Sequence, residues 1–241
     1  YIDYYKCFVA MQADKSIDVQ LGFLLKMEKE YPEGLMIYGP TITDYYYRSD
    51  DYAKAIEYAD KMIAKNRNYY SAYEQKVTAL LAKGDVDGAA KVCDALDTAE
   101  NAAGVASGDY TSYSLRANLY WYTGKYDEAI KVCEEGLEAS GGDSDIYRNE
   151  AIAYMLKGDY KKANECGKAA YQFSMNYGDL TLDMLNTAAL AAGLAKDDET
   201  YKSMQDYLKT YNYEVSSVVT DCLAGKKTVE QVFITDGGVI S

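Results

Sequence analysis

The chain has 241 residues, 49% of them hydrophobic, so it is long and apolar enough to bury a core or to build an elongated stack. Its 38 acidic and 25 basic residues give a net charge of −13, which disfavours a nucleic-acid backbone or an anionic membrane surface as a partner. A basic or neutral partner is electrostatically easier, although acidity of this kind also serves solubility alone. Only two prolines occur, and alanine, leucine, lysine and glutamate are abundant, which favours helix nearly throughout.

A repeated pattern organises most of the chain. Residues 1–34 are expected to form a degenerate first unit, and four clear copies follow within residues 36–176. Each copy combines a turn, a bulky residue and an alanine three places later, between two apolar helical stretches. The bulky residues are Tyr52, Val86, Tyr126 and Tyr160, spaced by 34, 40 and 34 residues. A period in this range is typical of a stack of helical hairpins.

Small and large residues recur at fixed places in these units. The alanines Ala55, Ala89, Ala129 and Ala163 fall on each second helix, and bulky residues recur near the end of each first helix. Small residues facing large ones predict closely interlocked helix pairs. The longer units carry extra residues around Asp97–Gly108 and Asn176–Thr181, which we expect to be loops because they contain Gly, Ser, Asn and Asp.

Beyond the clear repeats, residues 182–212 predict a degenerate last helical pair, and residues 213–241 a tail. Within the tail, Asp221–Gly225 is expected to close a short helix, and Thr228–Phe233 predicts either a capped helical turn or a short strand. The glycine-rich residues 236–241 are expected to be loosely held. Because a stack needs a cap, we expect the tail to cover the exposed face of the last repeat.

The recurring residues resemble the tetratricopeptide repeat. That family has 34-residue helix-turn-helix units with a large residue early in the first helix, a bulky one near its end, a Gly-x-Tyr turn and a small residue in the second helix. One unit here places Tyr113, Tyr120, Gly124, Tyr126, Ala129 and Cys133 at those positions. The resemblance implies an all-α, right-handed solenoid of about five to six helix pairs with a C-terminal cap, forming a single domain over residues 1–241.

The resemblance also implies where a partner binds. In this family the remaining face of the first helices lines a concave groove that holds the ligand. Carried over by position, the groove consists of Asp44, Tyr47, Arg48, Thr78, Leu81, Asn118, Trp121, Tyr122, Arg148, Ile152 and Met155. Trp121, the only tryptophan, is the expected anchor. The alternative is that these residues take part only in ordinary packing.

The sequence offers little for catalysis. Without histidine there is no imidazole base or metal ligand, and no Cys-x-x-Cys pair or Gly-Lys-Ser/Thr phosphate loop occurs. The five cysteines are odd in number and far apart, which favours reduced thiols. A family subclass that clamps a C-terminal carboxylate needs a lysine where this chain has Ser114, which argues against such a clamp. We therefore expect no enzyme activity, no cofactor and no metal.

The sequence thus predicts a non-catalytic scaffold that binds a peptide or protein partner in the groove. The alternatives are a cell-surface receptor for a small molecule or glycan, since tyrosine and tryptophan rings stack on sugars, and an accessory module of a longer protein. The chain starts at Tyr1 and not at methionine, so we expect it to be a piece of something longer. It shows no signal peptide and no apolar run of membrane-spanning length. Its location stays open between the cytoplasm and the exposed part of a membrane-anchored protein.

Overall fold

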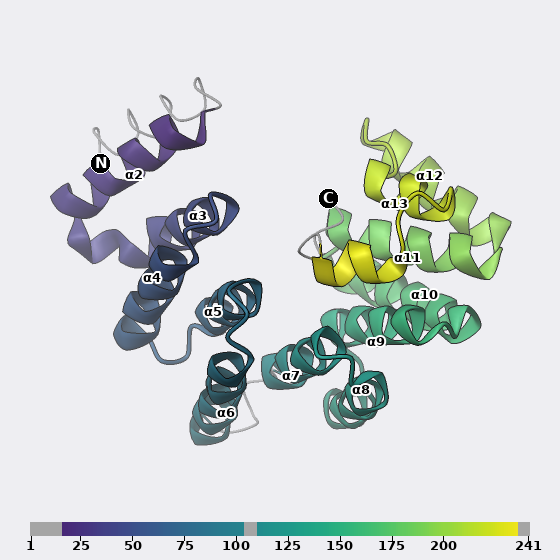
Figure 1. The fold of residues 1–241 in the computed structure, drawn as a ribbon, viewed down its shortest axis with the longest axis horizontal. Coiled ribbons are helices and arrows are strands. Elements are labelled where there is room, and N and C mark those ends of the chain that lie inside the picture. Colours follow the sequence, from purple (N-terminus) through teal and green to yellow (C-terminus); the bar gives the residue numbers. More distant parts are fainter. Residues whose placement is uncertain (1–15, 104–109, 236–241) are drawn as a thin grey trace. The chain divides into compact units, whose positions relative to one another are not determined.

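A computed structural model describes residues 16–103 and 110–235 of the chain (Figure 1). Within these ranges every regular element is helical. The predicted first unit is described only from residue 16, and the glycine-rich residues 236–241 lie outside the described residues. The elements are α2 (Ile17–Glu30), the 3-10 turn η1 (Pro32–Gly34), α3 (Leu35–Arg48), α4 (Tyr52–Lys65), α5 (Tyr70–Ala82), α6 (Val86–Ala103), α7 (Thr111–Tyr122), α8 (Tyr126–Ser140), α9 (Ser144–Lys157), α10 (Tyr160–Tyr177), α11 (Leu182–Ala195), α12 (Asp198–Thr210), α13 (Ser217–Leu223) and the π-helical turn η3 (Gln231–Thr235).

The turns inside the hairpins share one geometry, which explains the repeated sequence pattern. In each, one residue adopts a left-handed conformation, with φ of 82° at Gly84, 77° at Gly124 and 85° at Gly158. A side chain strains this conformation, so glycine is favoured there. The backbone N–H of the next residue then bonds to a carbonyl five positions earlier, as from Asp159 to Tyr154 at 3.0 Å. The Asp159 side chain caps the following helix by accepting a bond from the backbone N–H of Lys162.

The recurring alanines lie at the contacts between helices, as the pattern predicted. The alanines at position 55, 89, 129 and 163 are all 0% exposed, so none has room for a larger side chain without rearrangement. Gly136 shows the same closeness on α8, since a Cβ there would lie 2.8 Å from Tyr113 Cβ. The helix pairs are therefore interlocked through small residues, which confirms the predicted all-α repeat architecture.

Helix continues into the beginning of both predicted loops, and residues 104–108 of the first one lie outside the described residues. α6 extends to Ala103, so Asp97–Ala103 is helical, and α10 includes Asn176 and Tyr177. Ala99 is buried, at 1% exposed, which gives this last part of α6 a packed side. Burial and the good helix propensity of alanine outweigh the turn-forming residues nearby.

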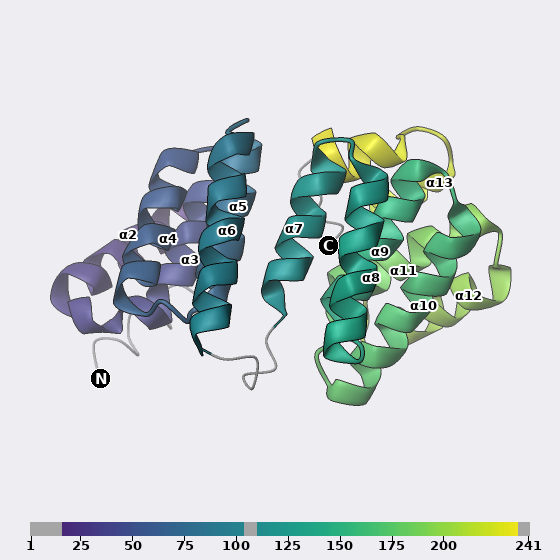
Figure 2. The same cartoon turned by 90° about the horizontal axis from the view of Figure 1, so that it is seen from below.

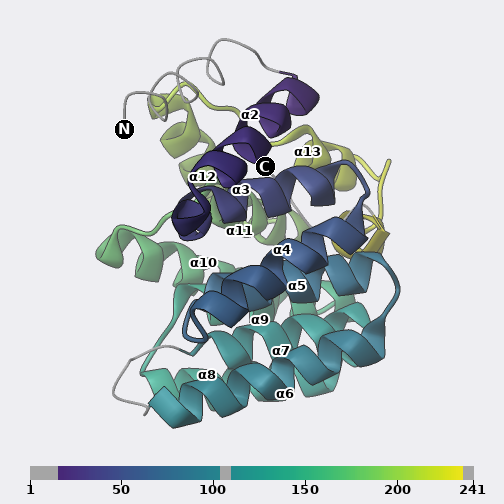
Figure 3. The ribbon, with the colours of Figure 1, turned by 90° about the vertical axis from the view of Figure 1, so that its left-hand side faces the viewer.

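The chain forms two compact units, residues 1–107 (unit 1) and residues 108–241 (unit 2). In unit 1, α3 packs against α2, α4 and α5, and α5 packs against α4 and α6 (Figure 3). In unit 2 the first helices α7, α9 and α11 contact one another in order, and the second helices α8, α10 and α12 pack against them (Figure 2). The predicted organisation of all 241 residues as one domain stays a prediction. In the described part of the chain, no helix is both long and apolar enough to cross a membrane.

The end of the chain folds back onto unit 2. We call residues 217–235, from α13 to η3, the C-terminal segment. α13 contacts α11, and η3 begins after a reciprocal cap in which the backbone N–H groups of Thr228 and Gln231 bond to each other's side chains at 2.8 and 3.1 Å. Of the two sequence alternatives for Thr228–Phe233, the helical one is therefore right.

Candidate functional site

The predicted groove residues fall on both units, and each half is described by itself. In unit 1 the set comprises Asp44, Tyr47 and Arg48 on α3, with Thr78 and Leu81 on α5. Asp44 and Arg48 are exposed and form a one-turn ion pair at 3.7 Å. Leu81 is only 3% exposed, so it belongs to the core of the helix pair. The part of the set that a partner can reach in unit 1 is thus the α3 residues together with the half-buried Thr78 on α5.

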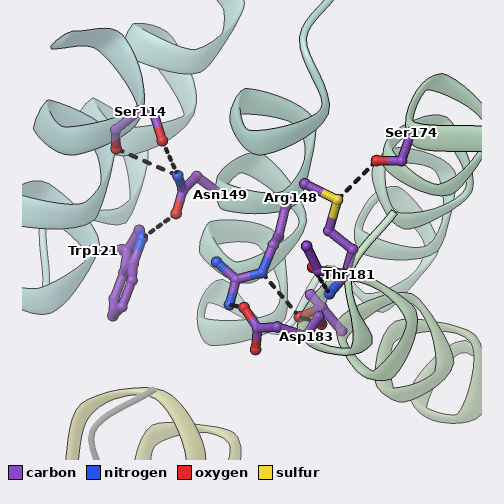
Figure 4. Close-up of polar contacts among 9 residues, drawn as sticks. Ser114, Trp121, Arg148, Asn149, Ser174, Thr181 and Asp183 are labelled. Atoms are coloured by element: carbon purple, nitrogen blue, oxygen red, sulfur yellow. Dashed lines mark hydrogen bonds and ion pairs between the residues drawn. The ribbon is translucent and has the colours of Figure 1, made fainter. Parts of the chain in front are cut away.

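In unit 2 we call the predicted set, Asn118, Trp121, Tyr122, Arg148, Ile152 and Met155, the first-helix face. Its tryptophan is buried, at 5% exposed. The Trp121 indole N–H donates to Asn149 Oδ1 at 3.2 Å, and Asn149 Nδ2 donates to Ser114 Oγ at 2.7 Å (Figure 4). Asn149 thus joins α7 to α9 and satisfies the indole N–H, which a buried donor requires.

The C-terminal segment covers the apolar part of this face. The Phe233 ring lies 6.3 Å from the Trp121 ring, edge to face at 70°, and is 1% exposed. Ile152 and Met155, at 0% and 1% exposed, belong to the same buried cluster as Val232 and Phe233. An outside partner reaches Trp121, Ile152 and Met155 only if the C-terminal segment leaves.

The polar part of the first-helix face is not buried in that cluster. Arg148 on α9 forms an ion pair with Asp183 on α11, and its Nε donates to Thr187 Oγ1 at 3.3 Å (Figure 4). Asn118 and Tyr122 are half-buried, with the Tyr122 ring 6.4 Å from that of Trp121. The face therefore has an apolar part under the C-terminal segment and a half-buried polar part beside it.

Sequence reasoning missed the partners of these residues. Phe233 lies in the predicted tail, and no repeat pattern links it to Trp121, 112 positions earlier. Asp183 lies in the last helical pair, whose degenerate sequence cannot be aligned with the clear repeats, so no groove position could be assigned there. A tail with one aromatic residue between aliphatic ones was the only available signal, since such a segment needs an apolar surface to cover it.

The comparison with family models gives one match. The tetratricopeptide-repeat model matches residues 43–104 and 114–178, together 127 of the 241 residues. The chain belongs to the tetratricopeptide-repeat family. This confirms the resemblance drawn from the recurring tyrosines, glycines and alanines. None of the curated proteins compared with the chain matches it significantly.

Solved structures of tetratricopeptide-repeat type resemble the chain in fold. A tetratricopeptide repeat protein from Parabacteroides merdae is 12% identical, with 95% of this chain and 86% of that chain covered and a TM-score of 0.52. BtubC (BKLC) from P. vanneervenii is 13% identical, with 88% and 94% covered and a TM-score of 0.53. At such identities the likeness shows the fold alone.

The tetratricopeptide-repeat core of unit 2 also buries a carboxyl group. Glu150 on α9 is 7% exposed. Burial raises the pKa of its carboxyl, and the nearby Glu134 acts in the same direction, while a hydrogen bond from Cys166 and the charge of Lys162 act against them. Burial also raises the pKa of the Cys133 and Cys166 thiols. Both cysteines are therefore packed thiols and not reactive thiolates at neutral pH. Among the described residues, no group of three His, Cys, Asp or Glu could hold a metal ion.

Replacing Glu150 by glutamine is expected to stabilise unit 2 at neutral pH. The folded state holds the proton more tightly than the unfolded state, so the carboxyl favours folding below its usual pKa of 4.5 and loses this advantage as the pH rises through its raised pKa. The gain of Glu150→Gln should therefore be present at pH 7 and vanish at pH 4. Urea midpoints of wild type, Glu150→Gln and the exposed control Glu138→Gln at both pH values test this. An equal gain at pH 4 and pH 7 would contradict it.

Proposed function

We propose that this tetratricopeptide-repeat protein is a non-catalytic scaffold that binds a peptide or protein partner on the face of its first helices. Proteins of the family bind protein partners and are in general non-catalytic. The observation that carries the proposal is that Val232 and Phe233 pack in one buried cluster with Trp121, Ile152 and Met155. The first-helix face thus accepts a short helical segment with an aromatic centre.

The half-buried and exposed polar residues suggest how a partner is held. Arg148, Asp183 and Asn118 offer both donors and acceptors beside the covered apolar part, so a partner gains polar contacts without displacing Phe233. On α3 of unit 1, Asp44 and Arg48 offer one charge of each sign. The net charge of −13 favours the approach of a basic or neutral partner, and the local charges on these surfaces, which are of both signs, then decide how it is held.

Photo-crosslinking in cells that express the native protein tests the proposal. The photoreactive residue p-benzoylphenylalanine replaces Tyr47 or Tyr122, both half-buried members of the predicted groove set, or Tyr160 at the start of the second helix α10 as a control. All three changes keep a para-substituted aromatic ring. We expect protein adducts from Tyr47 or Tyr122 and none from Tyr160.

Two results would contradict the proposal. Adducts from Tyr160 alone would move the partner to the second helices. No adduct at any position would argue against a protein partner and favour the second candidate below.

The second candidate is a receptor for a neutral small molecule or glycan. A hollow of about 440 Å³ in unit 2 is lined by three tyrosines and by no charged residue. Tyr207 lies in the last turn of α12, and Tyr211 and Tyr213 follow that helix. Tyr211 and Tyr213 are 59% and 51% exposed, so their rings are open to stacking. This surface offers rings and hydroxyl groups together, which suits a sugar.

A further inference from the structure

A second, larger hollow lies in unit 1, away from the predicted groove. It occupies about 620 Å³ between α4 and α6, over α5, and contains none of the predicted groove residues. This volume falls in the range of about 300–1,000 Å³ that binding pockets have. Its lining consists of Asp60, Ile63, Ala64, Arg67, Tyr73, Lys76, Leu80, Gly88, Lys91, Val92 and Ala95.

Small residues on its walls leave this groove open. α4 and α6 both pack against α5, and the wall residues Ala64, Gly88 and Ala95 lack the side chains to fill the space between them. The floor is apolar and fixed, because Tyr73 and Leu80 are buried at 3% and 6% exposed. The Tyr73 hydroxyl is satisfied by donating to the Arg67 carbonyl at 3.1 Å. A bulky apolar side chain would therefore meet a preformed surface.

The rim of this groove is basic, in contrast to the chain as a whole. Three cations and one carboxylate line it, although the net charge of the chain is −13. Lys76 Nζ lies 2.6 Å from Asp60 Oδ1, so these two charges offset each other. The other two cations, Arg67 and Lys91, are exposed and form no ion pair with a carboxylate of the described residues. Charges beyond the Debye length of about 8 Å are screened, so the local balance decides what binds here.

We propose that this groove binds an extended acidic segment of a partner protein. A leucine- or phenylalanine-sized side chain enters over Tyr73 and Leu80, and carboxylates on either side of it pair with Arg67 and Lys91. A nucleic acid fits less well, because two unpaired cations in an acidic chain give little phosphate neutralisation. This preference for an acidic ligand is opposite to the one expected from the net charge of the whole chain, because it comes from the basic residues on the rim of the groove. It involves neither the first-helix face nor the C-terminal segment, so it does not depend on the proposed function.

A random heptapeptide display library, selected on the full chain, tests this proposal. The selection is repeated on a variant with Arg67→Glu and Lys91→Glu, and on Lys83→Glu as a control. Lys83 is an exposed lysine of the same unit that does not line the groove. Because all three substituted residues are exposed, we expect circular dichroism spectra unchanged from wild type.

We expect wild type and Lys83→Glu to enrich peptides with aspartate or glutamate flanking leucine or phenylalanine. The most enriched peptide, resynthesised, should bind the Arg67→Glu/Lys91→Glu variant at least about tenfold more weakly, because attraction becomes repulsion at both sites. Its affinity for wild type should also fall with added salt. Enrichment of basic or neutral peptides, the same affinity for the double variant, or no enrichment at all would overturn the proposal. A further result would also overturn it: no peptide is enriched, and succinate or inorganic phosphate binds wild type but not the double variant.

Discussion

Replacing Phe233 by alanine is expected to lower the free energy of unfolding of unit 2 by about 3–5 kcal/mol, the usual cost of removing a buried phenylalanine ring. Phe233 is 1% exposed and meets Trp121 edge to face, so the change opens a cavity and uncovers the indole. Since Trp121 is the only tryptophan, its emission reports on unit 2 alone. We expect a red-shifted native emission and a lower urea midpoint.

Two further variants make this experiment decisive. Phe233→Leu keeps most of the apolar volume and should cost less than about 1.5 kcal/mol. Tyr177→Ala removes an aromatic ring that is 72% exposed and should leave the Trp121 emission unchanged. If Phe233→Ala gives the emission maximum and midpoint of wild type, the C-terminal segment does not cover the first-helix face in solution.

The packing of Phe233 against Trp121 also affects which partners the first-helix face accepts. A partner that binds Trp121 must displace the packed Phe233 ring. It gains affinity only if its own contacts bury more apolar surface than the displacement exposes. A partner that uses Arg148 and Asn118 meets no such cost. Weak partners are therefore expected on the polar part, and partners that resemble the C-terminal segment on the apolar part.

The repeats could be predicted from the sequence because each rests on local, repeated chemistry. A left-handed glycine such as Gly158, a capping aspartate such as Asp159 and a small residue such as Ala163 recur at one spacing, and each has one structural role. The end of α6 was predicted wrongly for the same reason. Residues 97–103 contain turn formers, and the packing of Ala99 that keeps them helical has no local signal.

The candidate site was less predictable, because its contacts link distant parts of the chain. Position within a repeat indicated that Trp121 and Met155 share a face, but not that Phe233 covers it. Position also marked Ser114 as the place where a clamping lysine is missing, while its actual role is to accept a hydrogen bond from Asn149 that links α7 to α9. Pairing across more than one hundred residues depends on how the chain returns, which no single-sequence pattern encodes.

Replacing Ala129 by leucine is expected to destabilise unit 2 by about 1–3 kcal/mol through overpacking. Ala129 on α8 is 0% exposed and belongs to the cluster that contains Trp121 and Ala163, so a longer side chain must push neighbouring helices apart. The matched control is Ala139→Leu, an exposed position on the same helix, which should change stability by no more than about 0.5 kcal/mol. Urea unfolding followed by Trp121 emission compares the two. Equal midpoints for both variants would mean that α8 does not nest against its neighbours through small residues, and the interlocked packing inferred for every repeat would fail with it.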